Sequence, residues 1–125
     1  MANSANWFET KRKAYKQRTV VLTTSATNVT YTAKTGRATD NFIIDAVIQV
    51  VTTSGNDMAI TLPDGTHAGQ TCLIECTTNA GATDTIDVAT STGDDSTQIT
   101  GVSGWSLLLW IDDTNGWVEQ NGSAT

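Results

Sequence analysis

The sequence predicts an all-β protein: a single β-sandwich or barrel domain of about eight or nine short antiparallel strands, preceded by a basic N-terminal arm. Threonine accounts for 24 of the 125 residues, and this β-branched, polar residue suits strands that have one solvated face. Charged residues make up 16% of the chain, and a helical bundle would need many more Ala, Leu, Glu and Lys residues. The length fits one domain, which we divide into an arm at residues 1–18 and a β domain at residues 19–125.

The strand expectations follow the chain in order, as short runs of Val, Ile, Thr and aromatic residues that are separated by turns. These runs are Thr19–Thr24, Asn28–Ala33, Asn41–Thr53, Met58–Leu62, the segment with Cys72, Ile74 and Cys76, Thr85–Ala89, Thr97–Thr100, Trp105–Ile111 and Trp117–Gln120. Pro63-Asp64-Gly65 is a turn signal, and Asn115-Gly116 is a strong hairpin signal. The spacing of the turns is typical of a sandwich or barrel, and no tandem repeat is visible.

Charge is divided unevenly along the chain. All seven basic residues lie at or before Arg37, so residues 1–37 carry a net charge of +6, whereas residues 38–125 carry −12. Five of these bases lie between Lys11 and Arg18. They indicate a solvated helix face, a segment that docks onto an acidic protein surface of its own body or of a partner, or a nucleic-acid-binding segment. The last is disfavoured because an acidic body repels phosphate.

The arm also contains aromatic residues. Asn6 and Glu9 have the spacing of a helix cap, so one short helix is expected there. The aromatic side chains either pack on their own domain or anchor a neighbouring protein. The candidate docking residues of the arm are Trp7, Phe8, Lys11, Arg12, Lys13, Tyr15, Lys16 and Arg18.

Catalytic chemistry is not indicated, so we expect a protein that is not an enzyme. The single histidine, His67, lies in a loop, and its spacing supplies neither a nucleophile nor an orienting group. Cys72 and Cys76 would share a strand face with their Cα atoms ~13 Å apart, whereas a disulfide needs less than ~7 Å. Buried free thiols are therefore expected, and two Cys with one His support zinc poorly.

No metal, cofactor or membrane span is expected. The pairs Asp94-Asp95 and Asp112-Asp113 are interpreted as solvated turn acids, although Asp113, Asn115 and Gly116 match part of a calcium loop. No apolar run approaches the ~18 residues of a membrane span. The first residues lack the apolar stretch of a secretory signal, which makes the cytoplasm the expected site of synthesis and assembly.

Three tryptophans are candidates for a subunit contact: Trp105, Trp110 and Trp117. Trp110 would lie on the opposite strand face from Trp105. Packing in the core or between subunits is favoured over stacking on a sugar.

The second half of the chain has a distinctive succession of strand motifs. It runs through Ile60-Thr61-Leu62-Pro63-Asp64-Gly65, then Gly69, Gln70, Cys72 and Ile74, then Asp84, Ile86 and Val88, then Ile99, Gly104, Ser106, Leu107 and Leu109, and ends in Asn115-Gly116-Trp117. This succession resembles the β-rich domains of tailed-bacteriophage virion proteins, most closely head decoration (cement) proteins, with fibre domains as relatives. The resemblance covers about half of the chain. It implies an all-β module without catalytic residues, often trimeric, that binds other virion proteins.

The sequence therefore leads to the hypothesis of a capsid decoration protein. Such a protein would sit on the outer surface of the phage head as a homotrimer, stabilise the shell and dock its arm on the major capsid protein. A small β domain with little apolar residue content gains stability by burying strand edges against copies of itself. The alternatives are a head or tail fibre or spike element and a carbohydrate-binding β-module.

Overall fold

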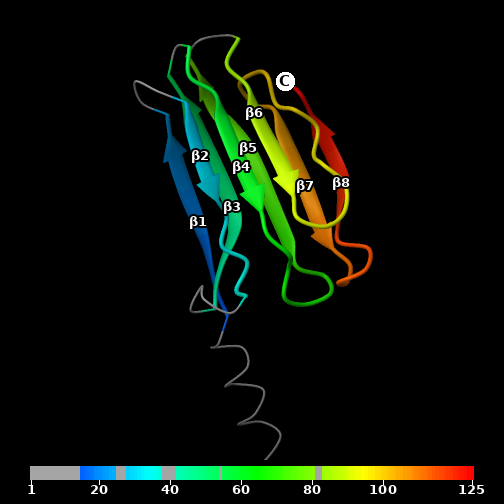
Figure 1. Cartoon of the computed structure of the whole chain (residues 1–125). Coiled ribbons are helices and arrows are strands. Elements are labelled where there is room, and N and C mark those ends of the chain that lie inside the picture. Colours follow the sequence, from blue (N-terminus) through cyan, green and yellow to red (C-terminus); the bar gives the residue numbers. More distant parts are fainter. Residues whose placement is uncertain (1–14, 25–27, 38–41, 54, 81–82) are drawn as a thin grey trace, which may run out of the picture.

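A computed structural model describes residues 15–24, 28–37, 42–53, 55–80 and 83–125. These residues form eight strands and no helix (Figure 1). The strands are β1 (Lys16–Thr23), β2 (Val29–Thr32), β3 (Ile43–Thr52), β4 (Met58–Leu62), β5 (Thr71–Asn79), β6 (Ile86–Thr90), β7 (Trp105–Trp110) and β8 (Trp117–Ser123). The all-β prediction is confirmed, and the short helix expected near Asn6 lies outside the described residues.

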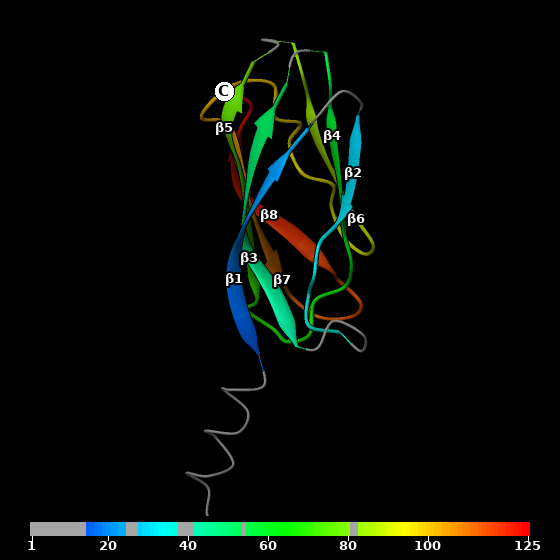
Figure 2. The same ribbon diagram turned by 90° about the vertical axis from the view of Figure 1, so that its left-hand side faces the viewer.

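The strands form two sheets that face each other in two layers (Figure 2). The larger sheet has the order β1-β3-β5-β7-β8 and the smaller sheet has the order β2-β4-β6, so the sheets are not closed into a barrel. From β2 to β7, each strand lies in the sheet opposite to that of the strand before it.

The expectation of antiparallel pairing is wrong for most of the fold. The pairs β1–β3, β3–β5, β2–β4 and β4–β6 are parallel, and antiparallel pairing in the described residues is confined to β5–β7 and β7–β8. The reason is that each connection from β1 to β6 crosses to the other layer and reverses the chain direction, so that a strand is parallel to the strand two steps later (Figure 1). β7 also changes layer, but it runs antiparallel to β5.

This arrangement is a structural repeat that is not evident in the sequence. Val29 pairs with Met58, and Met58 pairs with Ile86, at steps of 29 and 28 residues along the chain. Val47 and Leu73 pair across 26 residues in the larger sheet. The repeat requires matched strand spacing and inward apolar residues, and it requires no residue identity between its units.

The core lies between the layers and draws on both sheets. Its largest buried side chains are Trp110, Trp117, Ile44, Ile48, Met58, Ile60, Leu62, Ile74, Ile86, Ile99, Leu108 and Val50. The rings of Trp110 and Trp117 meet edge to face at 5.5 Å, and Trp117 Nε1 donates to the backbone oxygen of Pro63 at 2.8 Å. Burial of each large apolar side chain contributes ~1.5–3 kcal/mol, so the core between the two sheets makes the largest contribution to the stability of the fold.

One side of the two-layered body is covered by the connection between β6 and β7. Ile99 and Ile86 exchange two backbone hydrogen bonds, of 2.9 and 3.0 Å, and Trp117 N donates to Thr92 O at 2.9 Å. Thr97–Thr100, expected as a strand, contributes this bridge at Ile99 instead. On the opposite side, no described strand pairs with the outer edge of β1 or β2.

A glycine in the β7–β8 turn offers a test of this close packing. Gly116 has a φ of +73°, and a Cβ there would overlap the backbone of Thr92 and Gly93. We predict that Gly116→Ala lowers the free energy of unfolding by more than ~2 kcal/mol in a urea titration, because left-handed backbone strain adds to the overlap. Gly55→Ala is the matched control, since its φ is +79° and its Cβ would meet nothing within 4 Å. Equal losses in the two variants would contradict the packing described.

Candidate functional site

A buried carboxylate fixes the first strand to the body. Asp45 in β3 is 2% exposed. It accepts hydrogen bonds from Arg18 Nε at 2.6 Å, from the Tyr31 hydroxyl at 2.6 Å and from the backbone N–H of Lys34 at 2.8 Å. The three strands β1, β2 and β3 therefore meet at one side chain, and two of its partners reach it from different layers.

The protonation states around Asp45 favour this arrangement. Burial, reinforced by the hydrogen bond to Asp45, raises the pKa of Tyr31 to about 12. The hydrogen bond with Asp45 also raises the pKa of Arg18. The phenol and the guanidinium both keep their protons at neutral pH, so both donate to the carboxylate.

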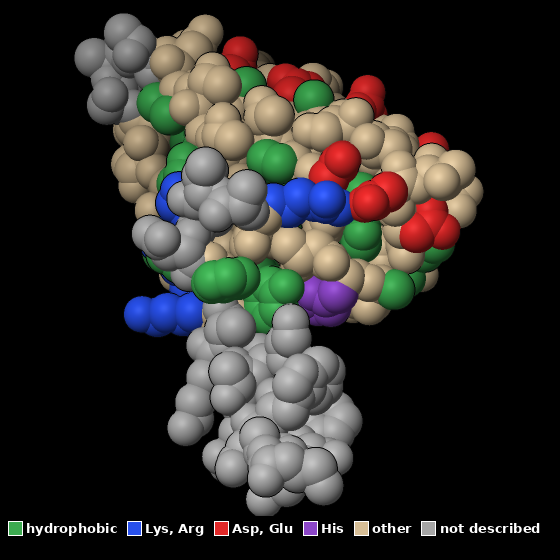
Figure 3. Space-filling view, turned by 60° about the horizontal axis from the view of Figure 1, so that its bottom comes forward, with side chains coloured by type: hydrophobic (Ala, Val, Ile, Leu, Met, Phe, Trp, Pro, Cys, Tyr) green, Lys and Arg blue, Asp and Glu red, His purple; other side chains and the backbone are tan. Residues whose placement is uncertain are grey.

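An exposed aromatic cluster lies at the end of the body where β1 begins. The ring of Tyr15 meets the ring of Phe42 edge to face at 5.6 Å and lies 5.5 Å from the ring of His67. Phe42 is 51% exposed and has a φ of +59°, an uncommon backbone conformation for a bulky residue. Strain of this kind is concentrated at functional sites. We call Tyr15, Phe42 and His67 the Tyr15 cluster; Figure 3 looks onto this end of the molecule.

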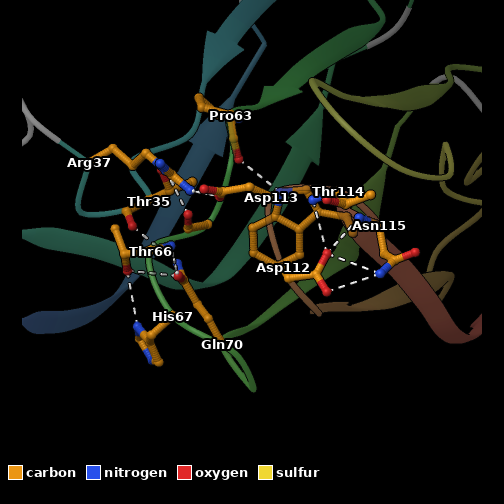
Figure 4. Close-up of polar contacts among 12 residues, drawn as sticks. Thr35, Arg37, Pro63, Thr66, His67, Gln70, Asp112, Asp113, Thr114 and Asn115 are labelled. Carbon is orange, nitrogen blue, oxygen red and sulfur yellow. Dashed lines mark hydrogen bonds and ion pairs between the residues drawn. The ribbon is translucent and has the colours of Figure 1, made fainter.

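A basic side chain beside the cluster holds three loops together (Figure 4). Arg37 donates from Nε to the backbone oxygen of Gly65 at 2.7 Å and forms an ion pair with Asp113. Its guanidinium carbon lies 5.7 Å from the ring centroid of Trp110. The loops after β2, β4 and β7 are thereby joined, which gives the exposed cluster a fixed support.

The loop that carries His67 is held by its own hydrogen bonds. Gln70 Oε1 accepts from the backbone N–H of Thr66 at 2.7 Å and from its hydroxyl at 3.0 Å, and Gln70 Nε2 donates to Thr35 O at 3.2 Å. The Thr66 hydroxyl lies 3.0 Å from Nδ1 of His67. His67 is exposed on this ordered loop, as expected from its loop position.

The structure divides the predicted docking residues into two groups. Tyr15 belongs to the Tyr15 cluster, and Lys16 and Arg18 lie in β1, so the expected arm overlaps the first strand. Arg18 forms an ion pair with Asp45, and its side chain is 35% exposed. The remaining docking residues lie outside the described part of the chain: Trp7, Phe8, Lys11, Arg12 and Lys13.

Two of the three tryptophans are core residues. Trp110 is 2% exposed and Trp117 is fully buried. Trp105 lies on the other face of β7 and is partly exposed. The prediction of a subunit contact therefore stays with Trp105.

The cysteine prediction is confirmed, since Cys72 and Cys76 are free and buried on β5. Burial raises the pKa of Cys72 to about 12. Within the described residues, no three His, Cys, Asp or Glu side chains are grouped so that they could hold a metal ion. The same part of the chain contains no helix long and apolar enough to cross a membrane.

No family model and no curated protein matches this chain. The role of Asp45 as an anchoring carboxylate is not predicted from the sequence. Asp45 is nevertheless the one charged residue in the apolar run at 41–53. A charge in such a run is the available signal, because a buried charge needs a partner.

Removal of the Asp45 charge tests whether this network fixes β1. We predict that Asp45→Asn lowers the free energy of unfolding by about 3 kcal/mol, because Arg18 loses its buried counter-charge and one accepting oxygen is replaced by an NH2 group that faces other donors. The control Asp87→Asn, at an exposed position on β6, should change it by less than ~0.5 kcal/mol. Similar urea midpoints for both variants would show that Asp45 has no special role.

Alkaline pH should weaken the fold. Folding raises the pKa of Cys72 from 9.0 and of Tyr31 from 10.0, each to about 12. The folded chain holds these protons more tightly than the unfolded chain does. The stabilisation is therefore complete below pH 9 and is lost as the pH rises towards 12.

We predict that Cys72→Ala makes this decline shallower, by up to ~1.4 kcal/mol per pH unit. Urea titrations between pH 8 and about 11 check this. A decline of the same slope in both proteins would rule out the contribution of Cys72.

Proposed function

We propose that this protein is a capsid decoration (cement) protein of a tailed bacteriophage. In this role a homotrimer binds the outer surface of the head, stabilises the shell and docks its basic arm on the major capsid protein. The proposal is supported by the sequence resemblance to virion β-domains and by the Tyr15 cluster, which is the observation that carries it. The chain is a structural protein and not an enzyme in this proposal.

The Tyr15 cluster and the arm would form one continuous docking surface. Five basic residues of the chain lie between Lys11 and Arg18, and the cluster lies at the end where β1 begins. Exposed ion pairs contribute only ~0–1 kcal/mol each, so exposed aromatic side chains are the better anchors. The supports at Arg18–Asp45 and Arg37–Asp113 hold this end in one conformation before binding. Preorganisation of this kind reduces the entropy lost on docking.

The charge of the body suits a dense coat. Residues 38–125 carry a net charge of −12, and a strong charge of one sign keeps crowded surfaces from associating non-specifically. The carbohydrate-binding alternative has less support, because Trp110 and Trp117 are buried and offer no ring to a sugar.

Charge removal in the arm tests the docking surface. We predict that Lys11→Gln, Arg12→Gln and Lys13→Gln together weaken binding to shells that lack the protein by about 10-fold in cosedimentation. The control Thr30→Glu, Thr61→Glu and Ala89→Glu changes the net charge by the same amount at exposed positions of β2, β4 and β6, and it should bind like the wild type.

A second variant separates docking from folding. Phe42→Gly removes a half-exposed ring and relieves the positive φ, so it should weaken shell binding while the free energy of unfolding changes by less than ~1 kcal/mol, because the relieved strain offsets the lost contact with Tyr15. Unchanged shell binding in both the arm variant and the Phe42 variant would contradict the proposed docking surface.

A further inference from the structure

The outward faces of the two sheets have different compositions. The outward positions of the smaller sheet are exposed and small or polar: Thr30, Thr32, Ala59, Thr61, Asp87 and Ala89. Outward positions of the larger sheet include many large apolar residues: Val21, Val47, Val51, Leu73, Trp105, Leu107, Leu109 and Val118. We call the latter set the outer apolar face.

The register makes the outer apolar face continuous. Val47 pairs with Leu73, and Leu73 pairs with Leu107, so three neighbouring strands carry one apolar row. Val21 and Trp105 lie at the two ends of the next row, with Gln49 and Glu75 between them, and Val21 is 61% exposed on the edge strand β1. Paired side chains on one sheet face lie ~5 Å apart, so the row of Val47, Leu73 and Leu107 is unbroken, and Trp105 adjoins it two residues along β7.

Strand composition indicates that this face is covered in the working protein. Parallel strands are usually buried on both faces and are then apolar at nearly every position. β3 has this composition, with the sequence IIDAVIQVVT, and it is the centre of the parallel pairs β1–β3 and β3–β5. In contrast, β4 and β6 alternate between buried and exposed residues, as strands with one solvated face do.

Charge distribution favours a second copy of the chain as the cover. Among the paired outward positions of the larger sheet, the one acidic residue is Glu75, and its carboxylate accepts a hydrogen bond from Gln49 Nε2 at 2.8 Å. Asp87 projects from the other outer face, and Asp94 and Asp113 are exposed in loops. Two copies of an acidic body repel each other least where their charges are fewest, and interface centres are depleted of charge.

We infer that the outer apolar face is the contact surface between copies of this chain. This face extends to the unpaired edge of β1, so that a neighbouring copy also covers the exposed Val21 on that edge strand. Trp105 is the aromatic anchor of this contact. The inference rests on the oligomer in the proposed function and names its interface.

The test compares matched pairs of threonine substitutions in the full chain. Leu73→Thr with Leu107→Thr places threonines on the outer apolar face, and Ala59→Thr with Ala89→Thr places them on the opposite face. Native mass spectrometry and light scattering measure the mass of each protein. We expect three chains for the wild type and the control, and a single folded chain for the Leu variant, whose dissociation constant should rise about 100-fold or more.

A second measurement does not depend on any variant. Carbene footprinting of the wild type at rising protein concentration should reduce labelling of Trp105 and Val21 and leave Thr61 unchanged. This measurement decides the matter if the Leu variant fails to fold.

Any of three results would overturn the inference: the wild type stays a single chain, the folded Leu variant stays oligomeric, or the labelling of Trp105 and Val21 does not change with concentration. A dimer that is disrupted by the Leu variant would confirm the surface and contradict the trimer. Shell binding by a single-chain wild type would overturn the interface and leave the decoration role intact.

Discussion

Alternation of the first six strands between two layers is the constraint on which the rest of the structure depends. Because β1 and β2 lie in opposite sheets, backbone hydrogen bonds must be made with strands 26 to 29 residues away. That requirement produces the parallel pairs and places one face of every strand in a shared core. It also leaves the outer edges of β1 and β2 without a partner strand in the described residues. The β7–β8 hairpin and the connection at 91–101 close the opposite side.

The unpaired side needs its own fixation, and Asp45 supplies it. β1 has one neighbouring strand in its sheet, so the Arg18–Asp45–Tyr31 contacts add a link to the other layer. This link positions the start of β1, and with it the Tyr15 cluster, at one end of the body. An edge that is rigid and exposed is suited to contacts with other chains, which connects the fold to the proposed assembly role.

The sequence was informative about strands and uninformative about their partners. Met58–Leu62 was predicted at its observed bounds, and the Asn115-Gly116 turn correctly indicated the β7–β8 hairpin. Alternating apolar residues give the same pattern in parallel and antiparallel strands, so pairing could not be derived from them. The contacts of Asp45 and Arg37 join residues up to 76 positions apart, and local patterns contain no signal for such pairs. Phe42 was read as part of an apolar run, because an exposed residue with a positive φ looks like any other apolar residue in sequence.

The central claim is that many copies of this chain coat a phage head. Quantitative mass spectrometry of purified particles from its source, with the major capsid protein as the internal reference, measures the copy number directly. A decoration role predicts hundreds of copies in fixed ratio to the shell protein. A handful of copies per particle would indicate a fibre or vertex element, and complete absence from particles would contradict the account.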